Sequence, residues 1–517
     1  MLPSPFAQRH LGFAVFVIIV CLSLSSQLVR AQSNAQSRIT QAIDENKLTL
    51  LQGNTHPLAR AEFDHGAAPA NLPMQRMLLV LSRSPQQEAA LQTLLEQQQA
   101  QSSPSFHKWL TPDEFGQQFG PSDQDIQTIT SWLEANGFQV SSVSRGRGVI
   151  EFSGAAAQVQ AAFHTAIHSY VVNGAQHWAN ANDPQIPSAL APVVLGVDSL
   201  NNFPKMALHY VVGIFAKSKT TKRLTPVSRT QPVSGSNPLY TYTCGYNPNT
   251  GSPFYCNGVT PYDFATIYNV LPLWTATPPI DGAGQTIAIV ARSNINLQDV
   301  ANFRSLFGLP ANPPQVILDG PDPGLVPGDE SEADLDVEWS GAVAKGATIK
   351  LVVSESTEAT DGVDLSAEYI VDNDVAPIMS ESFGDCELFM GTAGNQFYKS
   401  LWEQAAAEGI SVFVSAGDEG SAACDYFQGS TPQAAKDGLQ VSGIASTPYN
   451  VAVGGTDFND FFNPLTYWNA TSNSTTQESA KGTSRKPPGT IRAPTPSSVI
   501  RNSASALMRR PTATTIN

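Results

Sequence analysis

The chain contains eight histidines, and none of them follows His209. The second half of the sequence therefore offers no imidazole. A hydrolase built from that half could not use a serine–histidine–aspartate triad, and it could not bind a metal through histidine. Any general base there would have to be a carboxylate, and carboxylates are abundant in this half.

Long apolar runs are also scarce, and the exception lies at the N-terminus. Arg9 precedes the run Leu11–Leu24, and Ala31 offers a small residue for cleavage. This arrangement predicts a signal peptide over residues 1–31; the alternative is a single membrane anchor, for which the run is short. We therefore expect a secreted protein, extracellular or periplasmic, with no membrane contact once the signal is removed.

Basic residues are too few for a nucleic-acid-binding surface. The 517 residues include 29 Lys and Arg against 44 Asp and Glu, which gives a net charge of −15. This balance argues against a nucleic-acid partner and is typical of a soluble protein in an acidic or extracellular setting. The length allows two or three domains with sizeable cores.

Cysteine is rare, with five residues in the whole chain. Cys21 would leave with the signal peptide, and the even number that remains favours disulfides in an exported chain. Cys244 and Cys256 flank a turn-rich loop and could pair locally, which would leave Cys386 to pair with Cys424. Their spacing fits no zinc template, so we expect no metal at these cysteines.

Three segments differ in character. Residues 74–200 show a β-α-α-β-β-α-β order, with 77–82, 138–142, 149–152 and 167–172 as strands and 86–99, 123–135 and 155–166 as helices; this predicts a ferredoxin-like layer. Residues 206–260 are first basic and then rich in Ser, Pro and Gly, which predicts an exposed linker that is either a tether or a cleavage site. Residues 261–480 alternate strands (284–290, 347–353, 375–382, 410–415) with helices (296–307, 331–344, 393–408), which predicts a mostly parallel α/β sheet with active groups at the strand ends.

An acidic helix in the third segment carries candidate catalytic groups. With Ser331 as N-cap, Glu332 and Asp336 stand one turn apart on one face, where one of the two carboxyls would keep its proton to a raised pH. Such a pair can serve as a base for a weak nucleophile. The pairs Glu330/Asp334 and Asp334/Glu338 have the same spacing, and a solvated helix N-terminus or a calcium loop are the alternatives.

A second element is the turn 415–420, which follows the apolar strand 410–414. Its Asp418, between glycines at the end of a strand, could point into a cleft and donate a hydrogen bond to an oxyanion. The plain reading of this segment alone is an ordinary turn.

Together these motifs resemble the sedolisin family of serine-carboxyl peptidases, over roughly residues 40–480. The resemblance implies a subtilisin-like domain in which Glu332 is the base, Asp336 its partner and Asp418 the oxyanion group. It also implies that 380–384 is the substrate-lining strand, with Ser380, Ser382, Phe383 and Gly384 as its lining residues, and that 32–205, which contains His107–Phe115, is an activation propeptide. Intact members are expected to bind calcium at a C-terminal site, which is missing here.

The nucleophile of this family, in Gly-Thr-Ser-x-x-x-Pro, is absent from the sequence. Gly454-Gly-Thr456 is followed by Asp457, and Ser484 stands before Arg-Lys-Pro-Pro, which cannot start a core helix. Residues 481–517 form a basic tail without acidic or aromatic residues, which we expect to be unfolded. Codons for this tail can be chosen so that one inserted base after Gly482 restores aromatic and acidic residues, so we infer a frameshift near Lys481.

The sequence thus predicts a secreted, monomeric, acid-acting endopeptidase zymogen that uses a Ser-Glu-Asp triad on peptide or protein substrates and is bound by its own propeptide in cis. Without the nucleophile, the printed chain is expected to be inactive. Two non-catalytic alternatives remain. The propeptide domain could inhibit or chaperone a related peptidase, or the chain could be a cell-surface binding module, for which the glycosylation triplets at Asn469 and Asn473 are the only sign.

Overall fold

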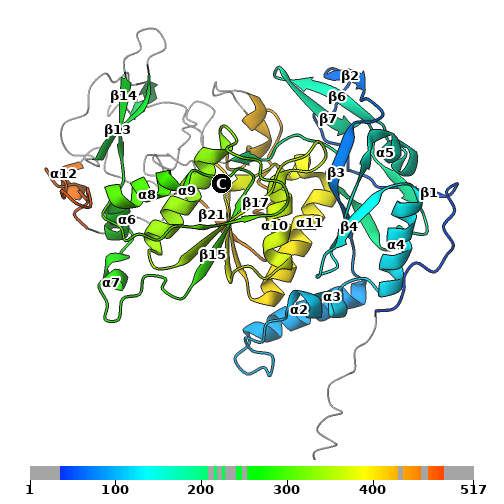
Figure 1. The fold of residues 1–517 in the computed structure, drawn as a ribbon, viewed down its shortest axis with the longest axis horizontal. Helices are drawn as coiled ribbons and strands as arrows, with labels where there is room; N and C mark the ends of the chain where they lie inside the picture. Colours follow the sequence, from blue (N-terminus) through cyan, green and yellow to red (C-terminus); the bar gives the residue numbers. More distant parts are fainter. Residues whose placement is uncertain are drawn as a thin grey trace, which may run out of the picture.

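The computed structural model describes residues 35–207, 215–217, 224–226, 240–246, 253–428, 435–455 and 464–482. The predicted signal peptide (1–31) and nearly all of the basic tail (481–517) lie outside these ranges. Two sheet-containing bodies stand side by side, an N-terminal one in blue and cyan and a C-terminal one in green and yellow (Figure 1).

The N-terminal body contains a four-stranded antiparallel sheet in the order β4-β5-β3-β9. This spatial order, together with the succession of strands and helices along the chain, is that of a ferredoxin-like fold, as predicted. A cluster of Phe138, Phe152, Phe163 and Trp132 fills the space between the sheet and its helices. The elements are β3 (Pro73–Leu81), α2 (Pro85–Gln99), α3 (Pro112–Phe119), α4 (Asp123–Ala135), β4 (Gln139–Val143), β5 (Val149–Ala155), α5 (Ala156–Phe163) and β9 (Val194–Asp198).

The prediction was wrong about the last strand of this layer. Residues 167–172 form β6 (Ile167–Val172), which pairs with β2 (Asp64–Ala67) and β7 (Ala175–Asn180) in a separate three-stranded sheet. β9 takes the expected place beside β3. Gly196 interrupts β9 and weakens its strand pattern, which explains why the sequence did not reveal it.

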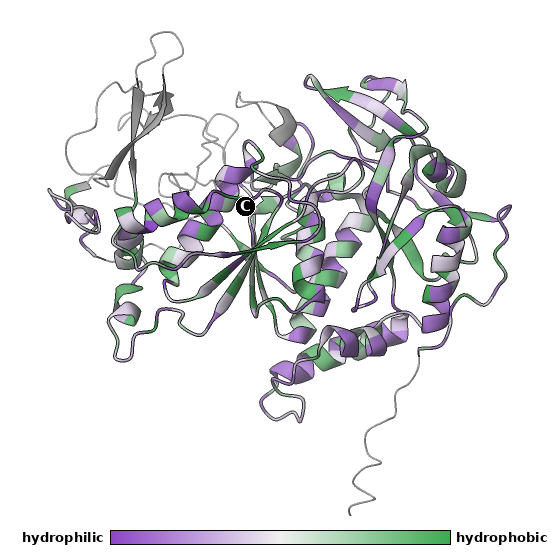
Figure 2. Cartoon of the chain, viewed as in Figure 1, coloured by the Kyte–Doolittle hydropathy of each residue, from purple (hydrophilic) through white to green (hydrophobic). Residues whose placement is uncertain are grey.

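The C-terminal body is built on a six-stranded parallel sheet in the order β16-β17-β15-β18-β20-β21. This confirms the predicted parallel α/β class. Its central strands are the most hydrophobic part of the body, because helices cover both faces (Figure 2). The elements are β15 (Thr286–Ala291), α8 (Leu297–Leu306), β16 (Gln315–Leu318), α9 (Asp329–Val343), β17 (Thr348–Val353), α10 (Gly362–Asp372), β18 (Ile378–Glu381), α11 (Glu387–Glu408), β20 (Ser411–Ser415) and β21 (Val451–Val453).

Residues 206–260 are not only a linker, because they contain β-structure that the sequence did not predict. β10 (Met206–Ala207) pairs with β19 (Phe383–Gly384), and β13 (Tyr240–Tyr246) pairs with β14 (Pro253–Gly258). The predicted Cys244–Cys256 disulfide concerns side chains outside the described part of this hairpin. The remaining elements are β1 (Leu48–Leu50), β8 (Gln185–Pro187), β11 (Phe215–Lys217), β12 (Leu224–Pro226), α6 (Pro261–Ile267), α7 (Leu271–Trp274), a 3-10 helix (Ala423–Gln428) and α12 (Pro464–Tyr467).

The N-terminal body packs against α10 and α11 of the C-terminal body. The amides of Arg145 and Gly146 each donate to the Asp372 carboxylate at 2.7 Å, at the end of α10. Arg83 forms an ion pair with the fully buried Glu403 of α11. The two bodies are therefore joined by buried polar contacts as well as by apolar packing.

The segment 464–482 belongs to the C-terminal body. Trp468 is buried beside α6, and the amides of Ser479 and Ala480 donate to Asp263 Oδ1 at 2.6 and 2.7 Å. Asp263 in turn closes a capping box with Thr260 at the start of α6. Trp468, Ser479 and Ala480 are thus integrated into the core of this body. None of the described helices is long and apolar enough to span a bilayer.

Candidate functional site

The acidic helix α9 begins at Asp329 and not near Ser331 as predicted. Gly328 precedes it with a φ of 95°, a left-handed conformation that glycine adopts without strain, and Ser331 lies inside the first turn, where its hydroxyl donates to the Gly328 carbonyl. Acidic residues are favoured in this turn because the helix dipole is positive there. Arg292, which follows β15, binds both carboxylate oxygens of Asp329 at 2.9 Å and so fixes the helix start to the end of a central strand.

Asp336 points from α9 toward the end of β18, and Glu332 lies one turn before it on the same helix. Glu332 is 3% exposed. Asp336 Oδ1 accepts a hydrogen bond of 2.7 Å from the hydroxyl of Ser382, the residue that follows β18. Burial and then the nearby Glu332 raise the pKa of Asp336 well above its ordinary value, although the Ser382 hydrogen bond acts in the opposite direction. The direction of this shift is the one expected when two carboxyls lie close together in a buried position.

The other equally spaced carboxyls of the helix lie on a different face, toward α8. Burial, followed by the charges of Asp299 and Glu330, raises the pKa of Asp334 to about 6. Burial, followed by the charges of Asp334 and Asp299, raises the pKa of Glu338 to about 8. The structure therefore separates the two sets that spacing alone left equivalent, because Asp336 contacts the residue after β18 whereas Asp334 and Glu338 interact with the charge of Asp299 on α8.

Asp299, Glu330 and Asp334 place carboxylate oxygens within 4.8 Å of one another, which is an arrangement that could hold a cation. Hard oxygen ligands suit Ca²⁺, but this ion takes 6–8 of them and Asp299 is exposed. Three carboxylates alone do not make a calcium site, and the cluster is not at the C-terminal position where the family resemblance implied one. We assign no metal role to these residues.

The predicted substrate-lining strand carries a segment from the N-terminal half. Phe383 and Gly384 of β19 pair in antiparallel register with Ala207 and Met206 of β10. Ser380 lies within β18, between Ile289 of β15 and Phe413 of β20 in the sheet. An exposed strand edge that accepts another segment by main-chain pairing is a common way to bind an extended peptide.

The turn that carries Asp418 follows β20, at the same edge of the sheet. Asp418 itself is exposed. Its neighbours Ala416, Gly417, Glu419 and Gly420 line a small pocket together with Gly384, Asp385, Cys386, Ala423 and Ser442. The pocket has a volume of about 20 Å³, which is room for roughly one water molecule. The turn and the substrate-lining strand therefore lie close to each other.

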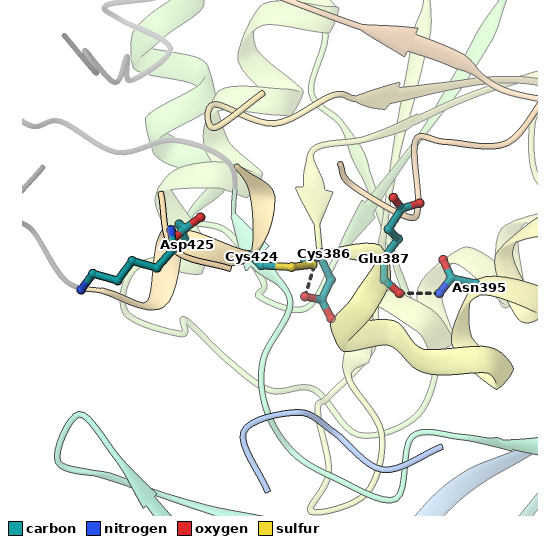
Figure 3. Close-up of a disulfide and its surroundings, with 7 residues drawn as sticks. Cys386, Glu387, Asn395, Cys424 and Asp425 are labelled. Atoms are coloured by element: carbon teal, nitrogen blue, oxygen red, sulfur yellow. Dashed lines mark hydrogen bonds between the residues drawn. A yellow bond between two sulfur atoms is a disulfide. The ribbon is translucent and has the colours of Figure 1, made fainter. Parts of the chain in front are cut away.

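A disulfide between Cys386 and Cys424 ties these two segments together (Figure 3). This is the second pairing expected from the sequence. Cys386 is the residue before α11 and follows β19 after one intervening residue, and Cys424 lies in the 3-10 helix that follows the Asp418 turn. The cross-link therefore limits how far the turn can move from the strand.

The structure also contains charged groups that the sequence analysis missed. Three of them lie at or near the ends of strands and helices around β19: Arg292, Asp361 and Asp364. Lys205 of the N-terminal half is buried among these three residues. Arg292 directly follows a buried strand, a signal that could have been read from the sequence. Lys205 and its acidic partners are 156 and 159 residues apart in the chain, so no local pattern joins them.

Comparisons with known proteins agree with this architecture. Residues 63–203 match the family described as "Pro-kumamolisin, activation domain". Sedolisin of Pseudomonas sp. (strain 101) is 29% identical over 73% of this chain and 59% of its own length. Xanthomonalisin of Xanthomonas sp. (strain T-22) is 26% identical over 84% of this chain and 50% of its own length, and kumamolisin of Bacillus sp. (strain MN-32) is 24% identical over 80% and 67%.

Among solved structures, Pseudomonas sedolisin (serine-carboxyl proteinase), complexed with two molecules of pseudo-iodotyrostatin, is 25% identical. The match covers 44% of this chain and 62% of that chain, with a TM-score of 0.33. The chain thus spans between half and two thirds of the length of these relatives.

Proposed function

Because this chain belongs to the sedolisin family of serine-carboxyl peptidases, we propose that it derives from the zymogen of a secreted, acid-acting endopeptidase. The observation that carries the proposal is the hydrogen bond from Ser382 to Asp336. It connects a proton-retaining carboxyl pair to the strand on which an extended peptide can bind.

In this proposal Glu332 takes the proton from the attacking serine, and Asp336 shares that proton and holds Glu332 in place. Asp418, in its protonated form, donates a hydrogen bond to the oxygen of the tetrahedral intermediate. Its position beside the substrate-lining strand, at the end of β20, supports this role. Carboxyls replace the imidazole that the second half of the chain does not contain.

The N-terminal residues 32–205 would act as the activation propeptide. The packing of this part on α10 and α11 and the pairing of β10 with β19 support inhibition in cis, because the segment occupies the edge that a substrate would use. Cleavage in the linker after residue 207 would then free the strand.

We propose no serine of these 517 residues as the nucleophile. Thr456 is followed by Asp457, and Ser484 stands in a stretch rich in Lys and Pro. We therefore propose that the chain as printed does not hydrolyse peptides by itself, and that a form carrying the remaining length of its relatives would do so.

A chimaera tests this function. Residues 1–480 are fused to the corresponding C-terminal portion of Pseudomonas sedolisin, and hydrolysis of denatured protein is measured at acid pH. We expect activity after removal of the propeptide, and a loss of about 10²–10³-fold in kcat for Asp418→Ala. A folded chimaera that hydrolyses nothing, or one in which Asp418→Ala is fully active, would overturn the proposed roles.

The docked N-terminal body also favours a second function, in which this part binds and inhibits a related peptidase in trans. Residues 32–207 would be added to active Pseudomonas sedolisin and the rate of hydrolysis recorded. Inhibition at micromolar concentrations or below supports this alternative, whereas undiminished hydrolysis at that concentration refutes it.

A further inference from the structure

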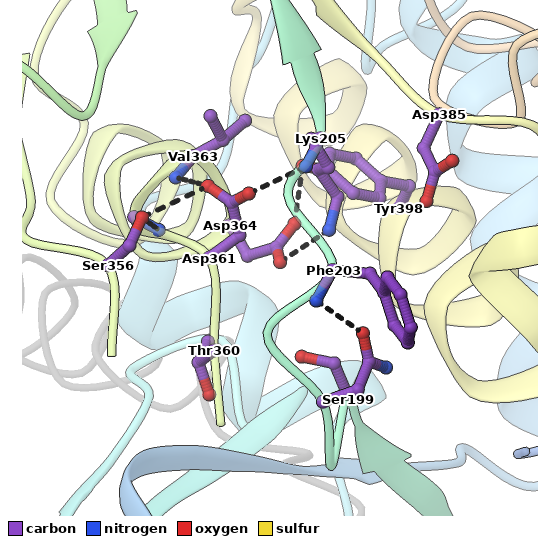
Figure 4. A network of polar contacts seen from close by, with 12 residues as sticks. Ser199, Phe203, Lys205, Ser356, Thr360, Asp361, Val363, Asp364, Asp385 and Tyr398 are labelled. Atoms are coloured by element: carbon purple, nitrogen blue, oxygen red, sulfur yellow. Dashed lines mark hydrogen bonds and ion pairs between the residues drawn. The ribbon is translucent and has the colours of Figure 1, made fainter. Parts of the chain in front are cut away.

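Lys205 is a buried cation at the boundary between the two bodies. Its side chain is 9% exposed, and its ammonium group donates to Asp364 Oδ2 at 2.6 Å (Figure 4). The ammonium also lies 5.9 Å from the centre of the Tyr398 ring. A lysine held in this way is completely desolvated, so its charge must be balanced by the surrounding carboxylates.

The main chain of the same residue is held by a second carboxylate. The amide of Lys205 donates to Asp361 Oδ2 at 2.8 Å, and this oxygen also receives Arg292 at 2.6 Å. The other Asp361 oxygen caps α10 by accepting the amide of Val363. Asp361 is thus fixed from three sides and positions the backbone, while Asp364 binds the side chain.

The wall of this pocket is strongly acidic. Tyr398 donates to Asp364 and lies 3.3 Å from Glu381 Oε1. The buried Glu381 Oε2 has no hydrogen-bond partner among the residues that the structure describes. Glu381 is 1% exposed. Asp385 lies near Tyr398 in Figure 4, and its charge also acts on Lys205. The wall thus holds four carboxyl groups against the single guanidinium of Arg292.

The register places this pocket in line with the substrate-lining strand. Met206 pairs with Gly384 and Ala207 with Phe383, so Lys205 is the residue immediately before the two that lie on the strand. A peptide that replaced β10 in the same direction would present its own side chain at this position. The four carboxyls of the wall belong to the C-terminal body and would remain after the propeptide leaves. Asp198 of β9, whose charge also acts on Lys205, belongs to the N-terminal body and would leave with it.

We propose that the pocket formed by Asp361, Asp364, Glu381, Asp385 and Tyr398 is a specificity subsite for a lysine or arginine side chain of the peptide substrate. Lys205 occupies it in the zymogen as a copy of that substrate residue. The subsite takes the residue that precedes the two strand-paired residues of the peptide. Asp364 binds the side chain of that residue, and Asp361 binds its main-chain amide. This inference rests on the proposed peptidase function.

The electrostatics of the pocket, with Lys205 in place, agree with a cationic ligand. Burial raises the pKa of Asp385 to about 7, while Lys205 lowers it. Burial and then Asp364 raise the pKa of Glu381 well above its ordinary value, and again Lys205 acts against the shift. Without a cation, these carboxyls would have to take up protons, so binding of a cation relieves an unfavourable arrangement.

The test uses the full chain with Lys205→Gly, Met206→Gly and Ala207→Gly, which removes the Lys205 side chain from the pocket and leaves a flexible glycine segment that a peptide can displace from the strand. Its folding is verified by circular dichroism. Binding of a fluorescent peptide with the sequence Phe-Pro-Lys-Met-Ala, which copies residues 203–207, is measured by anisotropy, and the same peptide with norleucine in place of lysine is the control. We expect the lysine peptide to bind at least about tenfold more tightly.

The additional change Asp364→Asn keeps the shape of the pocket and removes the charge. It should bring the two peptides to within about twofold of each other. Equal binding of both peptides to the emptied chain refutes the basic subsite but leaves the strand as a peptide site. Binding of neither peptide refutes the subsite and also the assignment of the strand, which separates the two failures.

Discussion

Ser382 donates a hydrogen bond of 2.7 Å to Asp336, and this contact joins the acidic helix α9 to the strand that carries β10. Asp336 Oδ2 is buried and has no hydrogen-bond partner in the described part of the chain. The Ser382 hydroxyl therefore donates the hydrogen bond that Asp336 Oδ1 accepts, in a carboxyl that is otherwise shielded from water. Its removal has consequences for stability and for the proton of the carboxyl pair.

Ser382→Ala should destabilise the folded chain by about 1–3 kcal/mol, because a buried acceptor loses its donor. The pKa of Asp336 should rise further, since the hydrogen bond lowers it. Urea denaturation at pH 7 measures the first effect. Ser380→Ala, two residues away, is the matched control, and equal losses in both variants would show that the hydrogen bond has no special role.

Asp198→Asn should stabilise the chain at neutral and alkaline pH. Burial and then Asp364 raise the pKa of Asp198 from an ordinary 3.8 to about 8, although Lys205 lowers it. An acid whose pKa is raised on folding contributes stability that is present below pH 4 and is lost as the pH rises through 8. The melting temperature of the variant should match the parent near pH 4 and exceed it at pH 8. A constant difference at both pH values would contradict this assignment.

Asp372→Ala should weaken the docking of the N-terminal body, because Asp372 accepts the amides of Arg145 and Gly146. We expect the dissociation constant to rise by about 10–100-fold once the linker has been cut at an engineered protease site. Isothermal titration of the separated halves measures it. Asn373→Ala, an exposed neighbour, should leave the constant unchanged; a similar rise in both variants would indicate a nonspecific effect on α10.

Much of the fold followed from local patterns, whereas the contacts between distant segments did not. The bounds of α4 and β6 agree with the sequence to the residue, because helix caps and turn glycines mark them. The pairing of β6 with β2 could not be predicted, because the two strands are more than a hundred residues apart in the chain. Spacing on α9 gave three candidate carboxyl pairs, and only the packing of α9 against β18 and α8 distinguishes them.

The pocket around Lys205 was invisible in the sequence for the same reason. The composition of residues 206–260 predicted an exposed linker, and nothing in it indicates that Met206 and Ala207 pair with Phe383 and Gly384. Buried charge clusters of this kind depend on tertiary contacts, and composition alone places lysine at the surface.

The genomic reading frame provides another prediction. Ser479 and Ala480 are bound to the C-terminal body through Asp263, whereas the composition changes sharply from Lys481 onward. We expect resequencing through codon 481 and several hundred bases beyond to reveal a one-base change that restores a frame with Gly-Thr-Ser-x-x-x-Pro. If the printed frame stands and no frame contains this motif, inhibition in trans becomes the better account of this product.

The central claim is that Glu332, and not another carboxyl of α9, serves as the base. The most direct measurement compares kcat of the restored chimaera with that of Glu332→Gln and Glu330→Gln, which make the same change on different faces of the helix. We predict that Glu332→Gln lowers kcat by about 10²–10⁴-fold and that Glu330→Gln changes it less than about threefold. Full activity of Glu332→Gln, or equal losses in both variants, would contradict the account.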